Sequence, residues 1–167
     1  AATAQIDPAT DRALTFSGHP EVIVPAGAEY LSDPIDYTVA PLSSLAITFH
    51  LDQPPAQQTG HPGSRATSYL VHGDQVSAAD LPDAKKIDHW VQLAEVDVAA
   101  PPGAAAIVTL GDSITDGHGA TTNGNDRWPD VLAERLQASA KTLTLGVPNQ
   151  GIVCNRLITH GLSPHAL

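Results

Sequence analysis

The pattern of hydrophobic and polar positions changes near residue 100. Before that point, short apolar runs alternate with turns rich in proline and glycine, a pattern that predicts β-strands. The predicted strands are 14–16, 21–24, 37–39, 45–51, 68–71 and 90–98. Several short strands spaced in this way are typical of a β-sandwich or jelly-roll-like module. We therefore expect a β-rich accessory module over 1–100, a linker over 101–103 and a second domain over 104–167.

The second domain begins with a parallel α/β pattern. The expected elements are a strand over 104–110, a polar loop over 112–126, a helix from Pro129 to about 140, a strand over 142–147 and a loop over 149–151. The first strand is a continuous apolar run, as in strands that are buried on both faces of a sheet. Ligands of parallel sheets bind beyond the carboxyl ends of the strands, so both loops are expected at a binding edge.

Composition excludes several classes of protein. The net charge is −10 without a cluster of lysine or arginine, which argues against nucleic acid or an anionic membrane as a partner. No apolar run is long enough to span a bilayer. Cys154 is the single cysteine, so a disulfide framework within the chain is excluded. The sequence has no methionine and no signal-peptide pattern at its start, and we expect it to be a fragment of a longer protein.

The segment Gly111-Asp112-Ser113-Ile114-Thr115-Asp116-Gly117 carries the sharpest chemical signal. A serine directly after a strand and between glycines lies exposed at the sheet edge, where it can attack a carbonyl while its own N–H stabilises the oxyanion. The alternative is a polar turn, because Gly, Asp and Ser favour turns for conformational reasons. In that interpretation Asp112 orders the turn by accepting backbone hydrogen bonds.

Three segments together resemble the SGNH hydrolases, also called GDSL esterases/lipases. They are Ile107-Val108-Thr109-Leu110-Gly111-Asp112-Ser113-Ile114-Thr115-Asp116-Gly117, Arg127-Trp128-Pro129-Asp130-Val131-Leu132, and Asn149-Gln150-Gly151-Ile152 with Asn155-Arg156-Leu157. The resemblance covers 106–167 and is greatest to the xylan-esterase-like branch, which has a β-rich module before the hydrolase domain. It implies a flavodoxin-like three-layer α/β domain that hydrolyses carboxylic esters, such as acetylated carbohydrate or short-chain esters, without a metal or organic cofactor.

The same resemblance implies roles for individual residues. Ser113 would be the nucleophile, and the oxyanion hole would use the N–H groups of Ser113 and of Cys154, which stands where the family usually has glycine. Asp112, Gly151 and Asn155 would support these loops. The family's later asparagine and its Asp-x-x-His pair have no counterpart after Ser113. We therefore expect a companion polypeptide that carries these groups, and we expect this chain to be inactive alone.

Two alternatives stay open. Cys154 in the glycine position and the lack of an Asp-x-x-His pair favour a non-catalytic carbohydrate-binding or interaction protein with a degenerate hydrolase domain. Arg127 and Trp128 either line an acyl or sugar pocket or pack the helix onto the sheet. Export from the cytoplasm is expected from the resemblance only.

Overall fold

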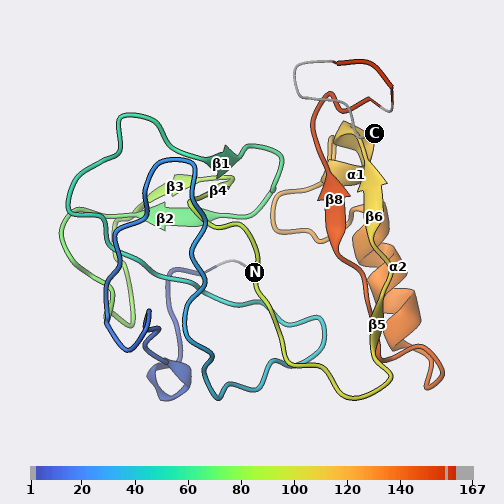
Figure 1. Cartoon of the computed structure of the whole chain (residues 1–167), viewed down its shortest axis with the longest axis horizontal. Coiled ribbons are helices and arrows are strands. Elements are labelled where there is room, and N and C mark those ends of the chain that lie inside the picture. The colour runs from blue at the N-terminus through green and yellow to red at the C-terminus, as the bar shows by residue number, and fades with distance from the viewer. Residues whose placement is uncertain (1–2, 157, 161–167) are drawn as a thin grey trace.

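The computed structural model describes residues 3–156 and 158–160, and its first hundred residues differ in architecture from the rest (Figure 1). The first part contains little regular structure: a short 3-10 helix (Pro8–Thr10) and two antiparallel ladders. Strand β1 (Gly60–His61) pairs with β4 (Trp90–Val91). Strand β2 (Ser68–Leu70) pairs with β3 (Lys85–Ile87).

The strand predictions for this part are confirmed only in places. The run at 68–71 forms β2, and the run at 90–98 forms only β4. The run at 14–16 contributes a single bridge, Phe16 to His19, and those at 21–24, 37–39 and 45–51 form no strand. Apolar side chains in these runs stay exposed, Ile23 at 91%, because no second sheet packs against them. The described residues therefore do not form a β-sandwich.

In the first part of the chain, a turn is held by hydrogen bonds that the Asp33 carboxylate accepts. Asp33 accepts hydrogen bonds from the Gly18 N–H (2.7 Å), the Thr15 hydroxyl (2.7 Å) and the Ser17 N–H (3.0 Å). These bonds stabilise the charged form, so the pKa of Asp33 is lowered, chiefly by the Gly18 N–H. The turn is correspondingly stabilised above the ordinary pKa of an aspartate and loses that support as the pH falls through the lowered value.

The second part contains a parallel pair of interrupted strands. Strands β5 (Ala105–Ala106) and β6 (Thr109–Gly111) pair in parallel with β7 (Leu145–Gly146) and β8 (Asn149–Gly151), respectively. Hydrogen bonds from the Ile107 N–H to the Gly146 carbonyl (2.9 Å) and from the Thr109 N–H to the Pro148 carbonyl (3.0 Å) connect the two ladders. Pro148 has no N–H to donate, which explains the interruption. The parallel prediction is confirmed, but the loop predicted at 149–151 is wrong, because this segment is β8.

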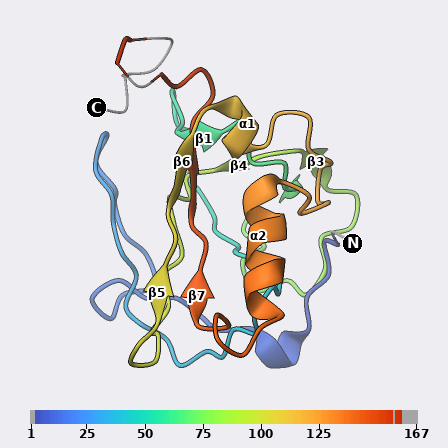
Figure 2. The same ribbon diagram turned by 90° about the vertical axis from the view of Figure 1, so that its right-hand side faces the viewer.

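Two helices lie beside this pair of strands (Figure 2). Helix α1 (Ser113–Asp116) contacts β6 and β8, and helix α2 (Trp128–Gln137) contacts β7. Helix α2 has a proline in its first turn, as predicted, and the Arg127 N–H donates to the Asp130 carboxylate (3.1 Å) at its start. It ends before the predicted residue 140 because the chain turns back: the Thr142 hydroxyl donates to the Leu136 carbonyl (2.7 Å).

The face of the strands opposite α1 is exposed and apolar. The side-chain directions of Gly111 and Gly151 point at α1, so the alternation along a strand puts Val108 and Leu110 on the other face. These side chains are 61% and 56% exposed, which contradicts the prediction of a strand buried on both faces. The reason is that no element of the described residues covers this face, so the described fold has a sheet layer and one helical layer.

Buried side chains in the described residues are mainly polar. They include Ser64, Thr109, Thr115 and Asp116. Among the described apolar residues, only Pro129 has a buried side chain. The chain exposes 12531 Å², while a compact monomer of 17.3 kDa exposes about 7800 Å². Little of the stability can therefore come from an apolar core. None of the described helices has the length and apolar character needed to cross a bilayer.

Candidate functional site

The carboxyl ends of β6 and β8 lie side by side and bring two polar loops together. Gly111 at the end of β6 pairs with Gly151 at the end of β8. The Gly111 carbonyl then accepts hydrogen bonds from the Ile152 N–H (3.0 Å) and from the Asn155 side-chain amide (3.3 Å). The segment that begins at Asp112 and the turn that contains Cys154 are therefore fixed at one edge of the sheet, where parallel sheets bind ligands.

Ser113 is the first residue of α1. Asp112 caps this helix, because its carboxylate accepts a hydrogen bond from the Ile114 N–H (2.9 Å), so the predicted role of Asp112 in ordering the turn is confirmed. Among the described residues, nothing hydrogen-bonds to the Ser113 hydroxyl, which is half-buried, and no histidine contacts it. The first N–H of a helix likewise has no partner within the helix. Ser113 thus presents a free hydroxyl and a free N–H at the sheet edge.

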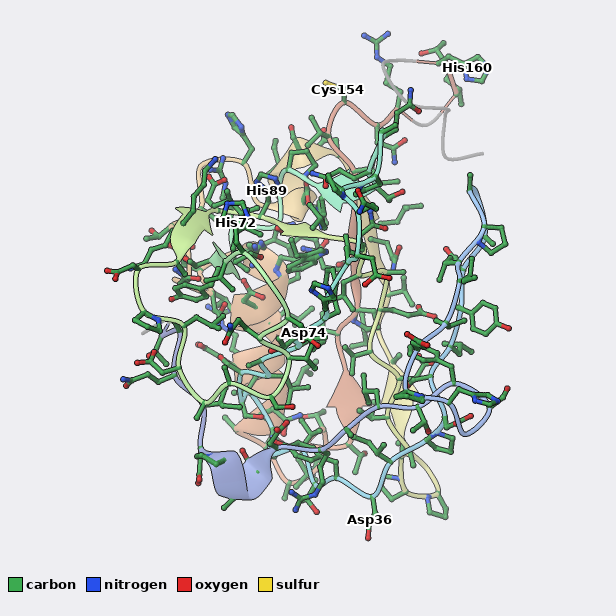
Figure 3. All side chains as sticks on the ribbon, turned by 90° about the vertical axis from the view of Figure 1, so that its left-hand side faces the viewer. Asp36, His72, Asp74, His89, Cys154 and His160 are labelled. Carbon is green, nitrogen blue, oxygen red and sulfur yellow. The ribbon has the colours of Figure 1, made fainter. Side chains whose placement is uncertain are left out.

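Cys154 lies in a turn whose backbone favours glycine. The Asn155 N–H donates to the Ile152 carbonyl (3.0 Å), which makes Cys154 the third residue of a β-turn. Its φ is 61°, the left-handed value that the third residue of a type II turn requires and that glycine adopts without strain. The Cys154 thiol is exposed at the end of the molecule (Figure 3). The N–H of Cys154 has no acceptor within the described part of the chain.

Close approach of backbones fixes α1 on the ends of the strands. A Cβ on Gly151 would lie 2.2 Å from the Asp116 nitrogen, and one on Gly111 would lie 2.1 Å from the Thr115 hydroxyl. The Asn149 side-chain amide donates to the Thr115 carbonyl (2.8 Å). Because side chains are missing at both glycines, the helix turn that carries Ser113 packs directly on the strand backbones. Gly151 therefore allows this turn to pack on β8 because it has no side chain.

Residues from the first part of the chain complete the surroundings of α1, and sequence analysis missed them. His61 Nε2 lies 2.5 Å from Oδ1 of Asp116, whose side chain is 2% exposed. Arg127 donates to the Asp116 carbonyl (Nε, 3.0 Å) and, through Nη2, to the Ser64 carbonyl. In the sequence, His61 and Ser64 stand in a Gly- and Pro-rich turn, with no signal that connects them to residue 116.

A groove of about 630 Å³ runs between the two parts of the chain, and Ser113 does not line it. His61, Trp90 and Arg127 contribute to its walls, together with strand β8. Trp128 lies elsewhere: its indole N–H donates to the Thr115 hydroxyl (3.3 Å), while the side chain is 46% exposed. Of the two alternatives for Arg127 and Trp128, neither holds for both residues: Arg127 lines the groove, whereas Trp128 joins α2 to α1.

The acidic residues near Ser113 have separate partners. Asp112 caps α1, Asp116 contacts His61, and Asp126 accepts a hydrogen bond from the Thr121 N–H (2.9 Å). Bonds from the hydroxyl and the N–H of Thr121 lower the pKa of Asp126. In the described part of the chain, no three His, Cys, Asp or Glu side chains are grouped so that they could hold a metal ion.

A parallel strand pair with a serine turn at its carboxyl edge is an arrangement of α/β hydrolytic enzymes. Residues 107–159 match the family model described as GDSL-like Lipase/Acylhydrolase. The match includes both polar loops and supports an SGNH-type α/β hydrolase fold and ester hydrolase activity in general. No curated protein matches the chain. Residue 157 and residues 161–167, including the end of the segment that carries the resemblance, lie outside the described residues.

We predict that Gly151→Ala destabilises the protein by about 1–3 kcal/mol, because the added methyl group collides with the backbone of α1. Gly146→Ala is the matched control: it lies in the neighbouring strand β7, where an added Cβ meets nothing within 4 Å. The measurement is the free energy of unfolding in denaturant. Equal effects of the two substitutions would contradict the close packing of α1 on β8.

We further predict that Cys154→Gly raises the free energy of unfolding by about 1 kcal/mol, because glycine adopts a φ of 61° without strain. The control is Val153→Gly, one position earlier in the same turn. We expect this substitution to lower the free energy of unfolding, because glycine raises the chain entropy of the unfolded state and relieves no strain in the folded state. A destabilising effect of Cys154→Gly as large as that of Val153→Gly would show that the cysteine is not strained.

Proposed function

We propose that the protein is a carboxylic ester hydrolase in which Ser113 is the nucleophile. The Ser113 hydroxyl attacks the ester carbonyl, the alcohol leaves, and water then releases the acid from the acyl-enzyme. The observation that carries this proposal is the position of Ser113: it begins α1 at the carboxyl edge of the sheet with its hydroxyl unpaired, inside the segment that matches the acylhydrolase family. Hydrolysis of this kind uses no cofactor.

The N–H groups of Ser113 and Cys154 are proposed to stabilise the oxyanion. Both groups belong to the two loops at the sheet edge, and neither has an acceptor among the described residues. Asn155 and Gly151 support this arrangement, since the Asn155 amide ties the second loop to the end of β6 and Gly151 allows α1 to approach. Loss of one such donor costs typically about 3–4 kcal/mol of transition-state stabilisation.

The proposed substrates are acetylated carbohydrate or short-chain acyl esters. This proposal rests on the resemblance of the three motif segments to the xylan-esterase-like branch of the SGNH hydrolases. Proteins of that branch are often exported, so we propose a secreted or extracytoplasmic location from the resemblance alone.

Ser113 also needs a general base, which we propose is supplied by a companion polypeptide, joined to this chain or separate. A serine without a base keeps its weak nucleophilicity, and among the described residues no histidine side chain is hydrogen-bonded to the Ser113 hydroxyl. The exposed apolar face at Val108 and Leu110 provides a place for it to pack. The companion would bring the third layer of the domain, an asparagine for the oxyanion hole and the Asp/His pair.

The nucleophile is tested with a fluorophosphonate probe and mass spectrometry. In protein purified from its natural source we expect stoichiometric labelling at Ser113, none in Ser113→Ala, and normal labelling in the control Ser139→Ala. This chain expressed alone, at 17.3 kDa, is expected to remain unlabelled, because no histidine side chain of the described residues is hydrogen-bonded to the Ser113 hydroxyl. Absence of labelling in the source material, with retention of Ser113→Ala on insoluble xylan, would instead support a non-catalytic carbohydrate-binding protein.

The proposed companion polypeptide is tested by introducing a charged side chain on the exposed apolar face at Val108 and Leu110. If this face is covered in the working protein, Leu110→Lys lowers its free energy of unfolding by more than about 2 kcal/mol, because an unpaired ammonium group is then buried. Ile23→Lys, at a position that is 91% exposed in the first part, is the control and should change it by less than about 0.5 kcal/mol. A neutral effect of Leu110→Lys would contradict the covered face.

A further inference from the structure

The helix turn that carries Ser113 is too short to be stable by itself. Helix α1 has four residues, and its backbone bonds run from Asp116 to the Asp112 carbonyl (3.0 Å) and from Gly117 and His118 to the Ser113 carbonyl (3.0 and 2.7 Å). A helix needs about 12–15 residues before it is even marginally stable in water. The native shape of the turn must therefore depend on contacts with other parts of the chain.

The strongest of these contacts is made at the end of the turn, by Asp116. Its carboxylate is buried, with Oδ1 2.5 Å from His61 Nε2. The other side of the carboxylate faces Gly63, where an added Cβ would lie 2.0 Å from Oδ2. His61 is the one hydrogen-bond donor to this carboxylate among the described residues, and without it the carboxylate would have to move toward water, taking α1 with it.

His61 is itself held in a defined orientation by the first part of the chain. It pairs with Trp90 across the β1–β4 ladder, and the two rings pack edge to face with centroids 5.3 Å apart. The Trp90 N–H donates to the Ser64 hydroxyl (3.1 Å), and the Ser64 carbonyl in turn accepts from Arg127. The β1–β4 ladder thus orients the imidazole toward Asp116, which lies 55 positions after His61 in the chain.

We propose that His61 is a positioning residue for Ser113, and that the first part of the chain acts as an internal support for the nucleophile turn. This inference rests on the proposed role of Ser113. His61 does not contact the Ser113 hydroxyl, so it acts only through Asp116 and is not the general base. When the contact is lost, α1 frays and the hydroxyl leaves the position from which it attacks the ester.

The test compares variants of the purified native protein, including any companion chain. His61→Ala removes the contact to Asp116, whereas His61→Gln retains an N–H donor in nearly the same place. His72→Ala is the matched control, because His72 is exposed and forms no hydrogen bond or ion pair with another described residue; Figure 3 shows where it lies. Amide hydrogen exchange reports on the shape of α1, and hydrolysis of p-nitrophenyl acetate reports on its function.

For His61→Ala we expect exchange at Asp116 and Gly117 to rise at least about tenfold, with no change at Val131 in α2. The kcat should fall by roughly 10- to 100-fold while KM changes less than about threefold, since misplacement of a reacting group by about 1 Å costs up to this factor. His61→Gln should restore most of both quantities, and His72→Ala should change neither.

Three results would overturn the proposal: unchanged exchange in α1 of His61→Ala, an equal rise in α1 and α2, or a failure of His61→Gln to restore kcat. If His61→Ala does not fold, Trp90→Leu loosens the imidazole without removing it and should raise exchange in α1 selectively. The exchange measurement needs no turnover. If the unmodified protein hydrolyses no ester, the proposed function fails, while exchange in α1 still decides whether His61 holds the turn.

Discussion

The buried carboxylate of Asp116 is the constraint on which the arrangement of this site depends. Asp116 joins three segments: its carboxylate contacts His61 in β1 and faces Gly63, and its carbonyl, in the nucleophile turn, accepts a hydrogen bond from Arg127 at the start of α2. A buried carboxylate needs a good hydrogen-bond donor, and among the described residues His61 supplies it. Because this chain buries so little apolar surface, its structure depends more than usual on such polar contacts.

This dependence gives the two parts of the chain different tasks. The parallel strands bring the loops with Ser113 and Cys154 to one edge, which is what a parallel sheet does by its geometry. The irregular first part then holds the outer side of α1, where the strands cannot reach. The groove between the parts follows from this contact, and some of the polar side chains that line it, such as Arg127 and Asp130, are hydrogen-bonded to one another.

Much of the second part could be predicted from sequence, because local rules determine it. The apolar run before Gly111, the proline at the start of α2 and the Asp112 cap all express preferences of single residues, and each is found. The strand at Asn149–Gly151 was not predictable, since a polar segment became a strand by pairing with β6. His61 was missed for a related reason: its role comes from a contact with a residue far along the chain, which no local pattern encodes.

The long separation between His61 and Asp116 also has a consequence for the order of folding. Closing a loop between distant positions costs chain entropy before any contact repays it, so such contacts form late. Helix α1 requires β8 on one side and the β1–β4 ladder on the other, and β8 is synthesised after both. The nucleophile turn is therefore completed only when the chain on either side of it is in place, and a partly folded molecule does not present the serine in its native position.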